Sequence, residues 1–306
     1  MDLRQRLAER KSGVLLFGLT PPRVTATPDD MARIAQVTLD RLEPLGLDGL
    51  VLYDIDDESD RNPDERPFPF MPTVDPAIFL NDHLKSWGRP VVMYRSVGKY
   101  AESELDAWLQ GEDAATVMTV FVGPSTGDKD VRTSLPRAHE LWRTTRPDLL
   151  LGGVAIPERH DSRGDEHLRM ARKQLGGCSF FVTQVVYDLN AAKSLVSDYH
   201  YACAEEGIEP VPVIFTFSVC GSLKTLEFLE WLGVSVPRWV RNELVHTGDT
   251  LAASYELALD TARELVEFCE RLGVPYGFNV ESVSIRKVEI EASTRLAGEL
   301  GTLLGR

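Results

Sequence analysis

The sequence predicts one (β/α)8 barrel (TIM barrel), an α/β fold, as a single domain over residues 1–306. Three observations support this prediction. Eight apolar, strand-like runs alternate with amphipathic stretches along the whole chain. The length of 306 residues suits such a barrel. There is no interdomain linker or low-complexity tract to divide the chain.

The predicted strands are continuous runs rich in Val, Ile, Leu and Phe. Strands that are buried on both faces of a parallel sheet have this composition. The eight strands are expected at residues 14–20, 48–55, 89–96, 115–123, 148–157, 179–188, 209–219 and 276–285.

Helical periodicity fills the intervals between these strands. Thr27 or Asp29 is the candidate N-cap of the first helix. Additional helices are expected between strands seven and eight. The predicted helices cover residues 29–42, 75–87, 101–111, 135–143, 165–177, 189–207, 222–233, 236–245, 251–272 and 286–305. Long loops are expected at 56–73, 124–133 and 157–165, each after a strand, where barrels carry their active sites.

A doubly wound open sheet is the alternative fold, because periodicity does not demonstrate closure. No GxGxxG follows the first strand, and no GxxxxGK[ST] occurs anywhere. Dinucleotide and P-loop fingerprints therefore do not support the open sheet.

The amino-acid composition argues against several classes of protein. The net charge is −14, from 33 Lys+Arg and 47 Asp+Glu, which argues against a general binder of nucleic acid or anionic membranes. No apolar run reaches the length of a membrane span, and the charged N-terminus does not resemble a signal peptide. The four cysteines are scattered, as in a reduced protein. We expect a cytoplasmic protein, with its oligomeric state left open.

The predicted strand ends carry the candidate catalytic and binding residues. Asp54 ends strand two and begins an acidic loop, where it could act as an acid or form a structural ion pair. Arg95 ends strand three and suits an anionic ligand, or else an ion pair with that loop. Glu281 and Arg286 lie near the end of strand eight, where they could bind a ligand or pair with each other.

Strands five and six contribute further polar groups. His160 follows strand five and is a candidate ligand contact. His160 and His167 lack metal-ligand spacing on one helix, and no third ligand is evident, so no metal site is expected. Gln184 lies within an apolar strand, so its amide must find partners, either in a neighbouring strand or in a heterocyclic ligand.

Several strings, in this order, resemble the methylenetetrahydrofolate reductase family. The first strand and its Pro-Pro turn read LFGLTPPR, and strand five continues as VAIPERH. A basic helix then leads into SFFVTQVVYD, with its Thr-Gln pair. LKTLEFLEWLGVSVPRWV and FNVESVSIRKVEIE match later segments, so the resemblance covers nearly the whole chain.

This resemblance implies an oxidoreductase of one-carbon metabolism on a barrel that binds a folate and, in typical members, FAD. Such members reduce 5,10-methylenetetrahydrofolate to 5-methyltetrahydrofolate with NAD(P)H. By position, Gln184 would contact the pterin and Arg286 the folate's glutamate end. His160, Arg172 and Lys173 would line the flavin site.

The chain departs from the family pattern at three places. Gly18 stands where the family carries the proton-donating Glu of strand one, and a glycine has no side-chain proton to give. Phe121-Val122-Gly123-Pro124 replaces an Arg-Gly-Asp segment near the flavin, and Ile156 replaces an aromatic residue.

Three explanations follow from these departures. In the first, another acid substitutes, with Asp54 preferred over Asp56, Glu58 or Glu281. In the second, hydride comes directly from NAD(P)H without tightly bound flavin. In the third, the protein does other chemistry, or none. We expect a reductase acting on a reduced folate, with Gln184 orienting the pterin and Arg286 or Arg95 holding the anionic tail. The alternatives are a non-redox pterin-dependent transferase or lyase, and a folate-binding protein without reductase activity.

Overall fold

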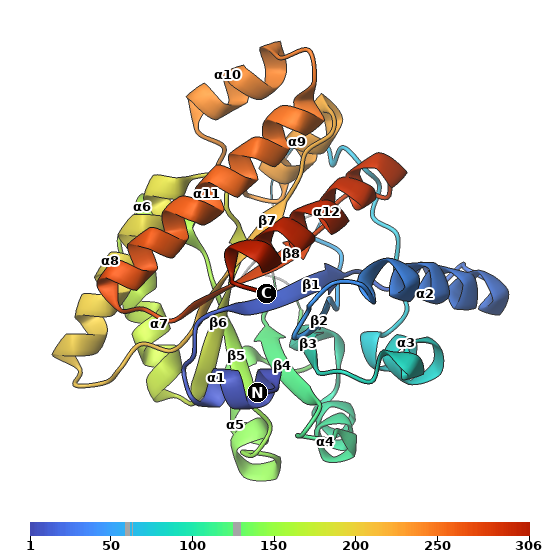
Figure 1. Cartoon of the computed structure of the whole chain (residues 1–306). Helices are drawn as coiled ribbons and strands as arrows, with labels where there is room; N and C mark the ends of the chain where they lie inside the picture. The colour runs from blue at the N-terminus through green and yellow to red at the C-terminus, as the bar shows by residue number, and fades with distance from the viewer. Residues whose placement is uncertain (59–61, 63, 125–129) are drawn as a thin grey trace.

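The computed structural model describes residues 1–58, 62, 64–124 and 130–306. Eight parallel strands form a closed barrel in sequence order, with β8 pairing back onto β1, and the helices surround it (Figure 1). This confirms the predicted fold and excludes the open sheet. The strands are β1 Val14–Leu19, β2 Gly49–Leu52, β3 Val91–Ser96, β4 Val117–Val122, β5 Leu151–Ala155, β6 Cys178–Val185, β7 Val213–Ser218 and β8 Tyr276–Glu281.

The strands are apolar on both faces because each face has its own core. Side chains alternate along a strand, so Leu16, Val51 and Phe180 point into the barrel and join an interior cluster. Phe17, Leu52 and Phe181 point outward and pack in the larger cluster under the helices. Burial of both faces explains the continuous hydrophobic runs in the sequence.

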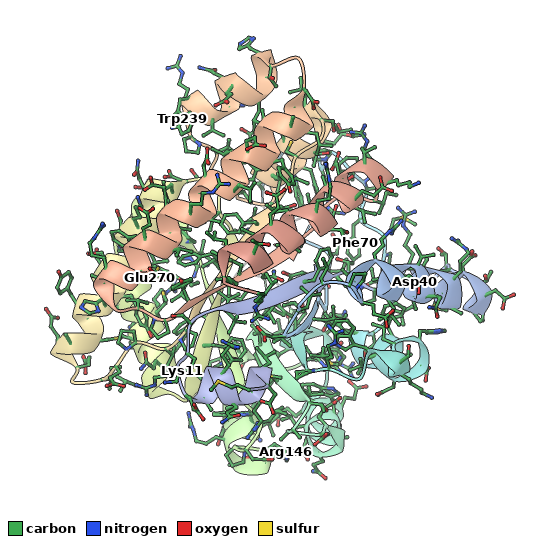
Figure 2. The ribbon with its side chains drawn as sticks, viewed as in Figure 1. Lys11, Asp40, Phe70, Arg146, Trp239 and Glu270 are labelled. Carbon is green, nitrogen blue, oxygen red and sulfur yellow. The ribbon has the colours of Figure 1, made fainter. Side chains whose placement is uncertain are left out.

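Helices follow the strands as predicted, and three of them lie between β7 and β8. The helices are α1 Leu3–Ala8, α2 Pro28–Leu42, α3 Pro76–His83, α4 Glu102–Gly111, α5 Leu135–Thr145, α6 Pro157–Arg163, α7 Glu166–Leu175, α8 Leu189–Glu205, α9 Leu223–Trp231, α10 Arg238–His246, α11 Thr250–Leu272 and α12 Lys287–Leu303, with 3-10 turns at Lys85–Trp87 and Val97–Lys99. Thr27 caps α2 through its side chain. The exposed Trp239 lies on α10, away from the barrel (Figure 2).

Two elements differ from the sequence prediction. The N-terminal segment forms α1, and its Leu3 and Leu7 join the interior cluster, so this helix closes one end of the barrel. Periodicity missed α1 because the helix is only six residues long and carries two arginines between its leucines. Residues 157–165, predicted as a loop, mostly form α6, which begins at Pro157, a residue favoured in the first turn of a helix.

No helix in the part of the chain that the structure describes is both long and apolar enough to span a bilayer. The candidate catalytic and binding side chains of the barrel lie at the carboxyl ends of the strands.

Candidate functional site at the barrel mouth

The carboxyl ends of the strands present polar side chains toward the barrel axis. Strand alternation turns Gly18, Tyr53, Gln184, Ser218 and Glu281 inward at the top of β1, β2, β6, β7 and β8. Glu281 lies directly beside Gly18 on one side and Ser218 on the other in the strand register. The inward-facing groups of three adjacent strands therefore meet at one place.

Glu281 is the acid of this cluster. Burial raises the pKa of its carboxyl to about 7, while a hydrogen bond from Tyr53 opposes that rise. The Tyr53 hydroxyl accepts a hydrogen bond from Asn279 Nδ2 at 2.9 Å, which leaves its own proton free to donate to Glu281. Asn279 also contacts Thr216 Oγ1 at 3.3 Å. This series of hydrogen bonds orients Tyr53 toward a carboxyl that can gain and lose a proton near neutral pH.

Gly18 makes room for this arrangement. A Cβ at position 18 would lie 2.9 Å from the Tyr53 ring and 3.0 Å from Glu281 Cβ. A glutamate on strand one would therefore collide with both side chains. The carboxyl expected on strand one reaches the same part of the mouth from the adjacent strand.

Two buried polar atoms beside Glu281 have no hydrogen-bond partner among the described residues. They are Ser218 Oγ and Asn279 Oδ1, and both residues are almost fully buried. Buried polar groups are nearly always paired, so unpaired ones at a barrel mouth indicate a place where a ligand is recognised. The ring of Tyr94 packs edge-on against Tyr53 at 4.9 Å and adds an apolar surface below them.

A second acidic group, Glu158, is linked to Gln184 through the segment that follows α9. Gln184 Nε2 donates to the carbonyl of Leu232 at 3.2 Å, and Glu158 accepts a hydrogen bond from the backbone N–H of Ser235 at 3.3 Å. One short segment after α9 therefore contacts both side chains. Burial raises the pKa of Glu158 to about 7, and its Oε2 is buried without a partner in the described chain.

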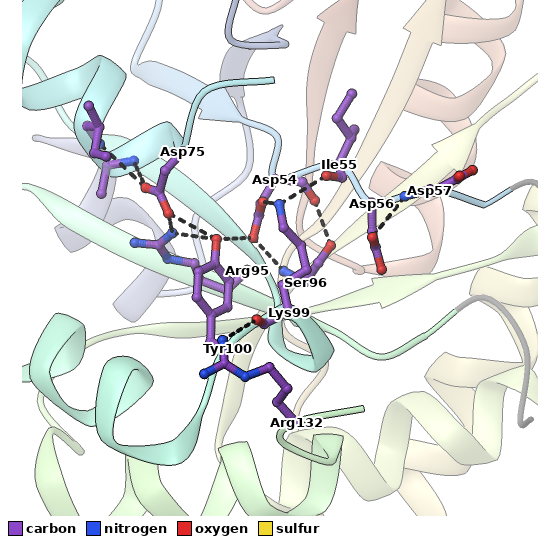
Figure 3. Close-up of polar contacts among 12 residues, drawn as sticks. Asp54, Ile55, Asp56, Asp57, Asp75, Arg95, Ser96, Lys99, Tyr100 and Arg132 are labelled. Atoms are coloured by element: carbon purple, nitrogen blue, oxygen red, sulfur yellow. Dashed lines mark hydrogen bonds and ion pairs between the residues drawn. The ribbon is translucent and has the colours of Figure 1, made fainter. Parts of the chain in front are cut away.

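Asp54, which we predicted as the replacement acid, has a different position. Its carboxylate accepts hydrogen bonds from the Ser96 backbone N–H at 2.9 Å and the Tyr100 hydroxyl at 2.8 Å, and it forms an ion pair with Lys99 (Figure 3). Asp54 follows the inward Tyr53, so alternation turns it outward. The structure therefore corrects the prediction: Asp54 anchors the turn after β3.

Arg95 also lies outside the mouth, which corrects its prediction as a tail-binding residue. Its guanidinium pairs with Asp75 at 2.7 Å (Figure 3). It also lies over the ring of Trp108, 4.3 Å from the ring centroid. Arg95 is 3% exposed and borders a cavity of about 280 Å³ that Asp75, Tyr100, Glu104, Leu105 and Trp108 also line. The guanidinium thus neutralises a carboxylate within the helical layer.

Arg286 forms a structural pair, but not with Glu281. It donates to the carbonyl of Gly221 at 3.2 Å and to the fully buried Glu289 at 3.1 Å. Because its charge compensates Glu289, binding a folate tail would require Arg286 to leave a buried carboxylate.

The three residues that the resemblance assigns to flavin have separate surroundings. His160 is buried and contacts Asp198 on α8, Lys173 donates to the carbonyl of Val154, and Arg172 is exposed on α7. These three side chains have different partners, and their assignment to one flavin site stays a prediction.

Sequence reasoning missed Tyr53 and Asn279. A signal existed in the last strand, where Asn279 and Glu281 alternate with Phe278 and Val280. Period-two polar positions in a buried parallel strand mark the barrel interior. Tyr53 carried no such signal, because aromatic residues are common in strands.

Comparisons with known proteins identify a similar protein among the solved structures. No family model and no curated protein matches it. Among solved structures, an uncharacterized protein from Clostridium thermocellum is 42% identical with a TM-score of 0.87, covering 98% of this chain and 99% of that one. That protein binds two copies of 5-methyl-5,6,7,8-tetrahydrofolic acid.

More distant structures share only the barrel. A GH113 beta-1,4-mannanase is 12% identical with a TM-score of 0.51, covering 94% of this chain and 99% of that one. A Plasmodium falciparum HPPK-DHPS with pteroate is 10% identical with a TM-score of 0.50, covering 97% of this chain and 48% of that one. At such low identity a shared barrel says nothing about function. The identity and coverage of the bacterial match, by contrast, show that this chain belongs to the family of the Clostridium thermocellum protein.

Proposed function

We propose that this protein binds a reduced folate of the 5-methyltetrahydrofolate type at the carboxyl-terminal mouth of its barrel. The observation that carries the proposal is the 42% identity, over 98% of the chain, to a protein that binds this compound. The mouth supports it with two tyrosine rings, an amide and two protonatable carboxyls.

Two groups of polar atoms, one around Gln184 and one around Glu281, recognise the folate in this proposal. A pterin presents a flat edge of alternating N–H donors and a carbonyl acceptor. Gln184 offers its Oε1 acceptor and one remaining N–H, since the other bonds the carbonyl of Leu232, and Glu158 Oε2, which has no partner among the described residues, accepts an N–H. On the other side, Ser218 Oγ and Asn279 Oδ1 offer unused polar atoms beside Glu281. Two groups of recognition atoms are consistent with the two folate copies in the homologue.

Titration calorimetry with 5-methyltetrahydrofolate tests this function. We expect Gln184→Leu to weaken binding by at least about tenfold, because the pterin edge then faces an apolar group. Gln36→Leu, on the exposed surface of α2, is the matched control and keeps the wild-type affinity. The proposal is wrong if the wild-type protein binds no folate, or if Gln184→Leu binds as the wild type does.

Glu281 favours a second, finer function, the reduction of 5,10-methylenetetrahydrofolate. In this proposed reaction the folate's five-membered ring opens at the bond between the methylene carbon and N10, which leaves an iminium at N5. A hydride from NAD(P)H adds to the methylene carbon, and Glu281 supplies the proton that N10 gains. The products are 5-methyltetrahydrofolate and NAD(P)+, and Glu281 recovers its proton from water. A pKa of about 7 suits a general acid at neutral pH.

The reductase proposal has its own test, NAD(P)H oxidation in the presence of 5,10-methylenetetrahydrofolate. We expect Glu281→Gln to lower kcat by about 10²–10⁴-fold, while the affinity for 5-methyltetrahydrofolate stays close to the wild-type value. Asp54→Asn is the control carboxylate and keeps kcat. A wild-type protein that binds folate but oxidises no NAD(P)H would leave the binding function standing and remove the reductase.

A further inference from the structure

Two histidines and an aspartate meet on the outside of the barrel. His160 lies on α6, His167 on α7 and Asp198 on α8, three helices that pack side by side (Figure 1). One potential ligand atom from each residue lies within 4.8 Å of the other two. Sequence spacing revealed no third group because Asp198 comes from a helix beyond the next strand.

The contacts within this cluster leave ligand atoms unused. His160 Nε2 bonds Asp198 Oδ2 at 3.0 Å, and the two imidazole rings lie edge to face with centroids 5.0 Å apart. Nδ1 of both His160 and His167 is buried and has no hydrogen-bond partner among the described residues. His160 itself is only 6% exposed, so its unpaired nitrogen lies away from bulk water. A buried, unpaired imidazole nitrogen calls for a ligand.

We propose that His160, His167 and Asp198 bind a divalent transition-metal ion, Zn²⁺ in the first place. Neutral imidazole nitrogens and a carboxylate oxygen are ligands that Zn²⁺ accepts, and three protein ligands leave a fourth position for water. Histidines in the set disfavour Mg²⁺ and Ca²⁺, which take oxygen ligands. The site is separate from the folate mouth and does not depend on the proposed function.

Binding requires a modest contraction of the cluster. Zinc–ligand bonds of about 2.0–2.2 Å put tetrahedral ligand atoms about 3.3–3.6 Å apart. His160 Nε2 and Asp198 Oδ2 lie 3.0 Å apart, slightly closer than this range, so His167 makes the larger movement. His167 is half-buried at the edge of the cluster, and the Asp198 side chain is 52% exposed, so both can change rotamer without moving the core. A bound ion would join α6, α7 and α8 and thereby hold the start of α6, which carries Glu158.

Titration of chelator-treated protein with ZnCl2, followed by calorimetry, tests the site. We expect one Zn²⁺ per chain, and no comparable heat with MgCl2. His167→Gln and Asp198→Asn, both at the edge of the cluster, each weaken Zn²⁺ binding by at least about tenfold. His160 is left unchanged in these variants because its replacement could disturb the helix packing.

His200→Gln is the matched control, since His200 is a half-buried histidine on α8 only two residues beyond Asp198. This variant keeps the wild-type affinity for Zn²⁺. With Co²⁺ as the probe, visible absorption bands from a tetrahedral site appear in the wild type and in His200→Gln, and are lost in His167→Gln. No Zn²⁺ binding by the wild type, or equal binding by His167→Gln and His200→Gln, overturns the proposal.

Discussion

Replacing Glu281 by Gln changes the way stability depends on pH. In the folded protein the pKa of Glu281 rises from 4.5 to about 7, chiefly through burial. Below pH 4.5 the carboxyl is neutral in both states. Between pH 4.5 and 7 the unfolded chain releases this proton while the folded chain keeps it, so folding stability falls as the pH rises. Above pH 7 the free energy of unfolding is lower by about 3 kcal/mol, because each unit by which the pKa is raised corresponds to about 1.4 kcal/mol.

Glutamine is neutral at every pH and still accepts the Tyr53 hydrogen bond. We therefore expect Glu281→Gln to raise the free energy of unfolding by about 3 kcal/mol at pH 8, and by less than about 1 kcal/mol at pH 5. Urea denaturation at both pH values measures this difference. Glu267→Gln, at an exposed position on α11, is the control and leaves the pH dependence unchanged. A gain of equal size at both pH values, or a loss at pH 8, refutes the burial argument.

Three further predictions concern residues whose contacts stabilise the fold rather than bind a ligand. Asp54→Asn breaks the ion pair with Lys99 and lowers the free energy of unfolding in urea by about 2 kcal/mol at pH 7, while folate affinity measured by calorimetry is unchanged. Gly18→Ala pushes a methyl group into the Tyr53 ring, so we expect the free energy of unfolding in urea to fall by about 1–3 kcal/mol. An increase in that free energy would show that the ring moves freely. Arg286→Met leaves a buried glutamate without its ion pair, so thermal denaturation should show a lower Tm with unchanged folate affinity; weaker folate binding at an unchanged Tm would restore Arg286 as a ligand residue.

The fold could be predicted because its signals are local and repeated. Continuous apolar strands, amphipathic helices and their strict alternation are each visible within a short window of sequence. The same logic located the additional helices after β7. It failed for α1, where two leucines in a charged segment, Leu3 and Leu7, close the barrel end, a role defined only by strands distant in the sequence.

The candidate site was predictable only in part. Gln184, within strand six, and Glu281, near the end of strand eight, were identified, and strand alternation turns both inward. Asp54 and Arg95 end strands as well, yet they point outward into ion pairs with Lys99 and Asp75. A shift of one residue along a strand reverses the direction of the side chain, and the sequence did not define the strand ends to that accuracy.

The amino-acid sequence by itself determined the order of strands and helices, the acidic surface and the residue types available at the strand ends. Tertiary structure decided which of those residues meet. Gly18 and Glu281 are far apart in the chain, and only barrel closure brings β8 beside β1. The raised pKa of Glu281 likewise follows from burial by its neighbours, because removing water from a carboxyl disfavours its charged form. The carboxyl that lies beside Gly18 on the first strand therefore belongs to the last strand.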